Sequence, residues 1–227
     1  MVARIKRKRC AWLLGAVLVI VALKMLYAAI RPPDEVVLTI GQSYEQVREQ
    51  SRSTLPPVEP GGDWGGLVTR PAKLRFTDPQ YGFTTPPAKF LSVAYDGHGN
   101  VDAIRMSPQV KTLPLDEAMA VFMDLQRQLR RGGWRPFHVE PNAPLADTPE
   151  VRAVVRTGDS PTTYWAAGDK YQAILFISRF VHENRPNDER YLITLNFGPP
   201  WLLDDTADIA GERRDRPVAS DEPAPER

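Results

Sequence analysis

The chain has 227 residues, of which 42% are hydrophobic and 25% charged, and this composition is typical of one globular domain with appended segments rather than of a disordered protein. Residues 1–31 hold seven cations and no acid, which leaves 22 cations and 28 anions, a net charge near −6, for the remainder. That balance excludes a nucleic-acid-binding protein.

The N-terminus combines a basic stretch with an apolar run. Five cations between Arg4 and Arg9 precede residues 11–30, which are apolar except for Lys24. About 20 apolar residues are enough for a helix to cross ~30 Å of hydrocarbon. The Leu, Ile and Val residues outweigh the cost of Lys24, whose long side chain can reach the headgroups. We therefore expect residues 11–30 to form a single transmembrane helix that anchors the chain in the lipid bilayer.

The charges around this run predict its orientation. Cations precede the run, whereas Asp34 and Glu35 follow it, so we expect a cytoplasmic N-terminus and a periplasmic C-terminal domain at a bacterial inner membrane. The alternative is a cleaved signal peptide, but Leu26 or Tyr27 would then stand where a small residue is required. The only cysteine is Cys10, so an exported domain would have no internal disulfide and would depend on its apolar core.

The exported part divides further by composition. From Asp204 onward the chain is acidic, contains several prolines and is poor in apolar residues, which is typical of a tail without stable structure. We therefore expect five segments: a basic N-terminus (1–10), the membrane helix (11–30), a linker (31–35), an exported domain (36–203) and an acidic tail (204–227).

The first half of the exported domain contains one helix signal among strand signals. Ser43 and Gln46 fit a capping box, which predicts a helix over about 43–53. Prolines and glycines predict a loop over 55–66. Alternating apolar residues and a turn sequence at 96–100 predict a hairpin. The strands and hairpin expected here span 36–40, 72–76 and 89–106.

The second half begins with the clearest helix. Apolar residues between Leu115 and Leu129 recur at intervals of three and four, so we expect a helix over 115–131 that ends at Gly132 and Gly133. Trp134 should fold back onto it as a core residue. The strands expected after it span 151–156, 162–166, 171–180 and 190–197. The predicted fold is α+β, an antiparallel sheet with two main helices packed on one face, preceded by the transmembrane helix.

No pattern of reactive side chains indicates catalysis. The three histidines, His98, His138 and His182, have no metal-ligand spacing, so a zinc site would require all of them to converge or to recruit carboxylates. The series from Asp96 to Asp102 lacks the glycine and the final acid of a calcium loop. Asp116 and Glu117 are better explained as helix-end charges. We therefore predict no catalytic residue, no metal site and no cofactor.

One loop has features of a binding site. Trp64 lies among four glycines at positions 61, 62, 65 and 66, and an exposed tryptophan there could contact a partner. The alternative is that the loop folds this tryptophan into the domain. We therefore treat Trp64 as a candidate partner contact.

A short segment resembles a known family. Residues 41–47, Gly-Gln-Ser-Tyr-Glu-Gln-Val, resemble the Gly-x-Ser/Thr-x-x-Gln-Val opening of the SmpA/OmlA (BamE-like) periplasmic domains. This resemblance implies a helix pair on a small antiparallel sheet and a role in protein contact rather than catalysis. The chain has no lipidated cysteine and no Gly-x-Pro after the helix, both of which the family has.

Two functions are therefore considered. The favoured hypothesis is a non-enzymatic, membrane-anchored periplasmic module that binds another envelope protein. The alternative is a periplasmic hydrolase or small-ligand-binding protein whose site is assembled from distant residues, such as His138 or His182 with nearby acids. A broad exposed apolar patch would favour the first, and a closed pocket with a strongly perturbed titratable group the second.

Overall fold

The structure, a computed structural model, describes residues 19–20, 23, 34–53, 55–56 and 64–202. The chain divides between Pro33 and Asp34 into two units. No helix among the described residues is both long and apolar enough to cross a membrane. The structure thus gives no support to the transmembrane helix of the predicted fold, most of which lies outside the described residues, as does the predicted tail over 204–227.

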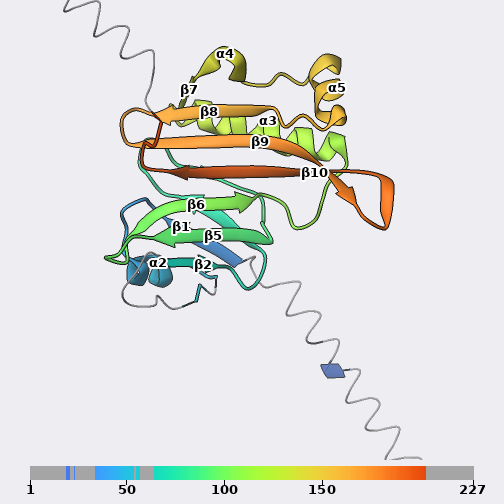
Figure 1. The fold of residues 1–227 in the computed structure, drawn as a ribbon. Coiled ribbons are helices and arrows are strands. Elements are labelled where there is room, and N and C mark those ends of the chain that lie inside the picture. Colours follow the sequence, from blue (N-terminus) through green and yellow to red (C-terminus); the bar gives the residue numbers. More distant parts are fainter. Residues whose placement is uncertain (1–18, 21–22, 24–33, 54, 57–63, 203–227) are drawn as a thin grey trace, which may run out of the picture. The chain divides into compact units, whose positions relative to one another are not determined.

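The unit that begins at Asp34 is built on a seven-stranded sheet, which Figure 1 shows face-on. Each neighbouring pair of strands is antiparallel. The predicted hairpin and the predicted strands over 162–166, 171–180 and 190–197 are confirmed. In order across the sheet, the strands are β2 (Trp64–Leu67), β5 (Phe90–Tyr95), β6 (Val101–Ser107), β10 (Arg185–Gly198), β9 (Tyr171–His182), β8 (Thr162–Ala167) and β7 (Arg135–Phe137).

A second, three-stranded sheet lies behind β5 and β6 (Figure 1). It consists of β1 (Asp34–Leu38), β3 (Ala72–Phe76) and β4 (Phe83–Thr84), and β1 pairs with β3 in parallel. Phe76 of β3 contacts Phe197 of β10, with ring centroids 5.1 Å apart. This contact covers one face of the large sheet, which we call the inner face. The opposite face is called the outer face.

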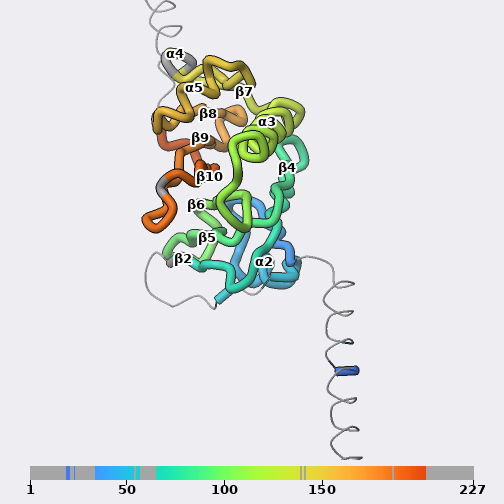
Figure 2. The backbone as a smooth tube through the Cα atoms, turned by 90° about the vertical axis from the view of Figure 1, so that its right-hand side faces the viewer, coloured from blue at the N-terminus to red at the C-terminus, as the bar shows by residue number. Residues whose placement is uncertain are grey.

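Helix α3 (Leu115–Arg131) covers the other half of the inner face, next to β9 and β10, as Figure 2 shows from the side. Its bounds are those of the predicted helix. The backbone N–H of Trp134 donates to the carbonyl of Leu129 at 3.0 Å, and only 2% of Trp134 is exposed. The predicted return of Trp134 into the core is therefore confirmed. The shorter helices are α2 (Tyr44–Gln50), α4 (Val139–Asn142) and α5 (Pro149–Thr157).

The predicted fold class, an α+β domain with two main helices on one face, is wrong. The described residues form ten strands and one long helix, so the domain is mostly β-sheet. The helix at the capping box of Ser43 and Gln46 forms, but it spans only Tyr44–Gln50. The small sheet takes the place of a second main helix. Its parallel pairing joins residues 34–38 to 72–76, and no local periodicity predicts a pairing between such distant segments.

A second correction concerns residues 151–156, which we expected to form a strand. They lie in α5, where the hydroxyl of Thr148 accepts a hydrogen bond from the backbone N–H of Val151 at 3.3 Å. Pro149 occupies the first turn, and Gly158 ends the helix with a φ of +98°. These start and stop signals outweigh the strand preference of the three valines in the segment.

A cluster of six aromatic side chains joins the layers, with neighbouring ring centroids 5.1 to 6.5 Å apart. The indole N–H of Trp134 donates to the carbonyl of Tyr81 at 2.8 Å, which ties the segment after α3 to the loop between β3 and β4. The cluster consists of Phe76, Tyr81, Phe83, Trp134, Tyr171 and Phe197.

A buried carboxylate holds the loop inside this cluster. One oxygen of Asp78 accepts the backbone N–H groups of Gln80 and Tyr81 at 2.9 and 2.8 Å. The other accepts the hydroxyl of Tyr171 at 3.0 Å, and only 7% of Asp78 is exposed. Asp78 therefore connects the β3–β4 loop to the first residue of β9.

Opposing effects act on the pKa of Asp78. Burial alone would raise it, but hydrogen bonds from Tyr81, Gln80 and Tyr171, together with the charge of Lys170, lower the pKa below its ordinary value of 3.8. The same contact acts on Tyr171, because burial and the hydrogen bond to Asp78 raise the pKa of its hydroxyl to about 12. The pair is therefore a carboxylate and a neutral phenol near neutral pH.

Replacing Asp78 should destabilise the domain more than replacing an exposed aspartate. In the full chain, Asp78→Ala leaves three donors without an acceptor, two of them buried, and we expect a loss of about 3 kcal/mol in the free energy of unfolding in urea. The matched control is Asp96→Ala, because Asp96 also accepts two backbone N–H groups, from His98 and Asn100, but in an exposed turn. Equal losses in the two variants would contradict this role of Asp78.

The contribution of Asp78 should depend on pH. Its pKa is lower in the fold than the ordinary 3.8, so the stabilisation is complete above that value and is lost as the pH falls through the folded-state pKa. We expect the urea midpoint of the wild type to exceed that of Asp78→Asn at about pH 7, and the difference to shrink between about pH 4 and pH 2. A difference that stays constant over this range would show that the charge of Asp78 does not stabilise the fold.

Candidate functional site

The two faces of the seven-stranded sheet differ in burial. Alternate side chains, such as Leu91 and Val93, point to the inner face and are completely buried. Their neighbours Ser92 and Ala94 point to the outer face and are partly exposed. No described helix or strand lies over the outer face, which is the face toward the viewer in Figure 1 and the left side of the sheet in Figure 2. This face is the candidate site.

Cross-strand register places side chains of the outer face in rows. The row through its centre contains one cation, Arg105, among apolar and small polar residues. It runs over all seven strands through Leu67, Ser92, Arg105, Asn196, Ile174, Tyr164 and Phe137.

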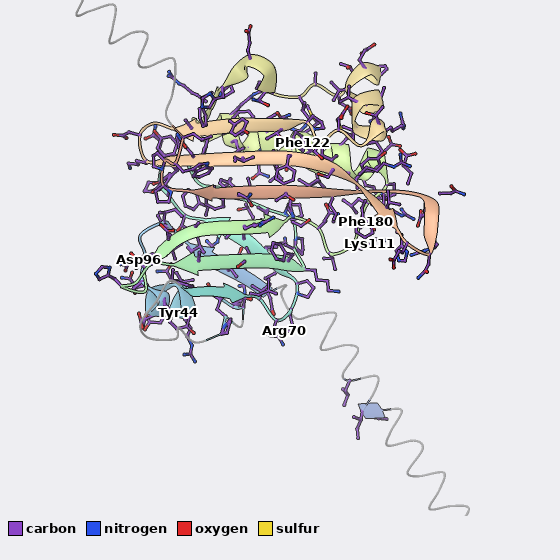
Figure 3. The ribbon with its side chains drawn as sticks, in the orientation of Figure 1. Tyr44, Arg70, Asp96, Lys111, Phe122 and Phe180 are labelled. Atoms are coloured by element: carbon purple, nitrogen blue, oxygen red, sulfur yellow. The ribbon has the colours of Figure 1, made fainter. Side chains whose placement is uncertain are left out.

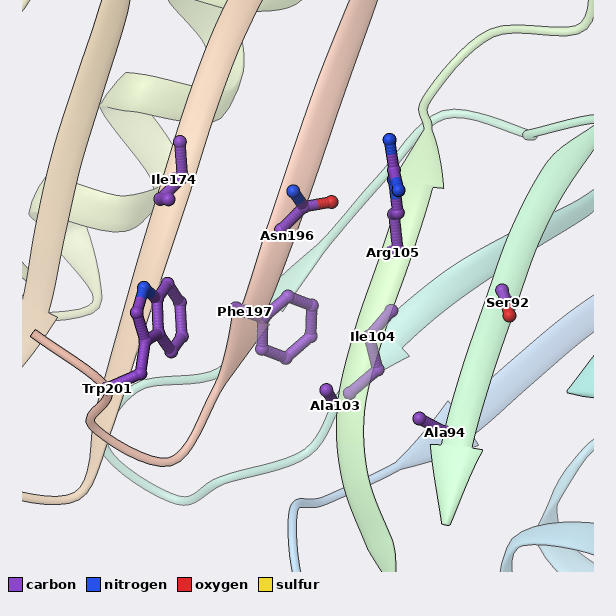
Figure 4. A pocket seen from close by; sticks show the side chains of 9 residues that line it. All are labelled: Ser92, Ala94, Ala103, Ile104, Arg105, Ile174, Asn196, Phe197 and Trp201. Carbon is purple, nitrogen blue, oxygen red and sulfur yellow. The ribbon is translucent and has the colours of Figure 1, made fainter. Parts of the chain in front are cut away.

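A groove of about 330 Å³ crosses this row, and we call it the Trp201 groove. Figure 4 shows its side chains at close range, with the indole of Trp201 on one side and Ser92 on the other. The volume is at the lower end of the range for ligand pockets. Its lining includes Ser92, Ala94, Arg105, Ile174, Asn196 and Trp201.

The groove exists because the next row of the outer face is made of small residues. Gly65 lies opposite Ala94, and Ala94 lies opposite Ala103. Gly198 continues the row, because a Cβ added there would lie 3.4 Å from the Cβ of Ala103 and 2.9 Å from the carbonyl oxygen of Asp102. Larger side chains in this row would fill the hollow.

One wall of the groove is fastened by a side chain of the outer face. The side-chain oxygen of Gln172 accepts the backbone N–H groups of Trp201 and Leu202 at 2.9 and 2.8 Å. Its amide N–H donates to the carbonyl of Leu202 at 2.6 Å. Since Gln172 is buried, these bonds hold Trp201 beside the groove while 44% of Trp201 remains exposed.

The polar groups of the groove are few. The side chain of Arg105 is exposed and has no ion-pair partner within the described part of the chain. The Asn196 Oδ1 is buried and accepts no hydrogen bond from the described residues, a situation that costs about 1–3 kcal/mol. Figure 4 shows this oxygen directed toward Arg105. The groove therefore offers one exposed cation to a bound molecule.

A second hollow of about 360 Å³ lies beside the first on the same face, and we call it the Val110 groove. It is mostly apolar, and the exposed Lys89 and Lys111 lie at its rim. Figure 3 shows Lys111 and Asp96 at opposite ends of the β5–β6 hairpin. The lining includes Leu67, Lys89, Phe90, Val110, Lys111 and Leu192.

The loop that carries Val110 is held by a buried amide. The amide N–H of Gln109 donates to the carbonyls of Lys111 and Tyr191, each at 2.9 Å. Its side-chain oxygen accepts the backbone N–H of Ile193 at 2.9 Å. Gln109 therefore fixes the loop against β10, so that the exposed Val110 and Lys111 are presented at a defined position beside the sheet.

The structure does not bring the three histidines together. His98 lies in the β5–β6 turn, His138 at the start of α4 and His182 at the end of β9. The described residues contain no group of three or more His, Cys, Asp or Glu side chains placed to hold a metal ion. A site built from His138 or His182 with neighbouring acids therefore remains a prediction without a matching cluster among the described residues.

Trp64 lies in a strand rather than in the loop expected over 55–66. It begins β2, an edge strand of the large sheet, and its backbone is opposite Tyr95. Its side chain lies outside what the structure describes. The sequence reasoning did not identify Arg105, Asn196 or Trp201, and the only signal for them is the alternation along β6 and β10.

Asp78, the buried carboxylate described above, borders a separate polar hollow with Gln80, Gln128 and Arg131. Both oxygens of Asp78 already accept hydrogen bonds from within the fold. The arrangement therefore explains the pKa shift of Asp78 as a structural effect.

Comparison of the chain with protein-family models, with curated proteins and with solved structures gives no match. The resemblance of residues 41–47 to BamE-like domains therefore stays a prediction.

Proposed function

We propose that the domain is a non-enzymatic protein-interaction module of the bacterial envelope, and that the outer face of the seven-stranded sheet binds an extended segment of a partner protein. The observation that carries this proposal is the set of large apolar side chains exposed on and beside that face. Leu67, Phe90, Val110 and Trp201 are 47%, 42%, 47% and 44% exposed. Large apolar side chains that are exposed together on one surface are typical of interaction surfaces.

The chemistry of the grooves supports binding better than catalysis. Arg105 is the only ionisable residue in the lining of the Trp201 groove, and Lys89 and Lys111 are the only ones in the Val110 groove. An arginine stays protonated in proteins and cannot act as a general base. A hydrolase of the kind considered as the alternative would need a base and a nucleophile within hydrogen-bond reach, and the lining of the Trp201 groove provides no such pair.

The proposed location in the envelope is supported by the sequence. Basic residues before a long apolar run are typical of exported proteins. The chain after Cys10 contains no cysteine, and a bacterial periplasm accommodates domains that fold without disulfides.

Photo-crosslinking tests whether the outer face is the contact surface. We place p-benzoylphenylalanine at Leu67, Phe90 or Trp201 of the full chain, expressed in bacterial cells, with Val154 of α5 as the control, because Val154 is 43% exposed on another element. We expect one discrete adduct, of the same partner, from the three outer-face positions and none from Val154. Adducts of equal yield from Val154, or no adduct from any outer-face position, would contradict the proposal.

A further inference from the structure

We infer that the partner segment is an extended peptide carrying two acidic residues separated by apolar ones, with one carboxylate on Arg105 and the second near Lys89 and Lys111. This inference rests on the proposed function and adds the chemistry of the partner. Two observations support this occupant, the charge of the groove linings and the shape of the two adjacent grooves.

The two grooves carry positive charge although the domain as a whole is balanced. Three cations, Arg105, Lys89 and Lys111, line the grooves, and no acidic residue does so within the described part of the chain. Residues 36–203 hold 18 cations and 18 acids, so the positive charge is local to the grooves. None of the three forms an ion pair with another described residue. Unpaired cations around an apolar surface favour carboxylates on the molecule that binds there.

The positions of these cations predict the spacing of the acids. Arg105 lies opposite Ser92, and Lys89 lies three residues before Ser92, immediately before β5 begins. At about 3.3 Å per residue, the two cations are roughly 10 Å apart along the strand direction. Because side chains alternate along an extended peptide, acids two or four residues apart would face both cations, and apolar side chains of the peptide would contact Phe90 and Trp201.

The shape favours a peptide over a compact small molecule. The Trp201 groove and the Val110 groove are neighbours, since Leu67 of the second lies opposite Ser92 of the first. Together they form one band over β5, β6 and β10.

Selection from a random peptide library tests the inference on the full chain. We expect the enriched peptides to carry two acids two or four residues apart, with apolar residues between them. A synthetic consensus peptide should then bind about tenfold more weakly to Arg105→Glu and about threefold more weakly to Lys111→Glu. The control is Arg48→Glu, an exposed arginine of α2, which should bind as the wild type does. Arg105→Gln and urea unfolding of each variant separate lost binding from lost folding.

The outcomes separate this inference from the proposed function. Enriched peptides without acids, or equal affinity of Arg105→Glu, would overturn the acidic segment, whereas the crosslinks from Phe90 would still support a partner on the outer face. Binding of dodecanoate without any selected peptide would assign the band to small amphiphiles. A dimer of the full chain that Arg105→Glu dissociates would assign it to a second copy. If a chain that ends at Leu202 selects peptides and the full chain does not, the band would be assigned to the acidic residues 204–227 of the chain itself. Each of these three results would overturn the inference.

Discussion

The structure depends on how the first two residues of β9 are held. Tyr171 points to the inner face and donates to the buried carboxylate of Asp78, which orders the loop between β3 and β4. Gln172 points to the outer face and fastens the backbone of Trp201 and Leu202. Because side chains alternate along a strand, one end of β9 fixes both the inner layer and a wall of the Trp201 groove. The geometry of the outer face is thus tied to the packing of the core.

The fold could be predicted from the sequence where the signal is local. The spacing of apolar residues and the glycines after Arg131 gave the bounds of α3, and Ser43 with Gln46 gave the start of α2. The inner layer could not be predicted, because the parallel pairing of β1 with β3 depends on contacts between distant segments. The same is true of α5, where a cap at Thr148 outweighed a run of valines. The predicted layer of two main helices was wrong because the inner layer depends on the distant pairing of β1 with β3.

The candidate site could be predicted even less. Alternation along β6 and β10 assigns Arg105 and Asn196 to one face, but it does not say which face the inner layer covers. The hollow arises from Ala94, Ala103 and Gly198, which three different strands bring into one row. Trp201 reaches the groove only through its bonds to Gln172. These relations appear only when the register of the strands is known, whereas the sequence drew attention to Trp64 and to the histidines.

Residue-level carbene footprinting tests the central claim most directly. The full chain is labelled in the cells that produce it and again after purification, and labelling of Phe90 and Trp201 is compared with labelling of Val154, which has a similar exposed fraction. We expect Phe90 and Trp201 to be labelled in the purified protein and protected in cells, while Val154 is labelled equally in both. Equal labelling of all three residues in both conditions would show that the outer face carries no partner and would contradict the account.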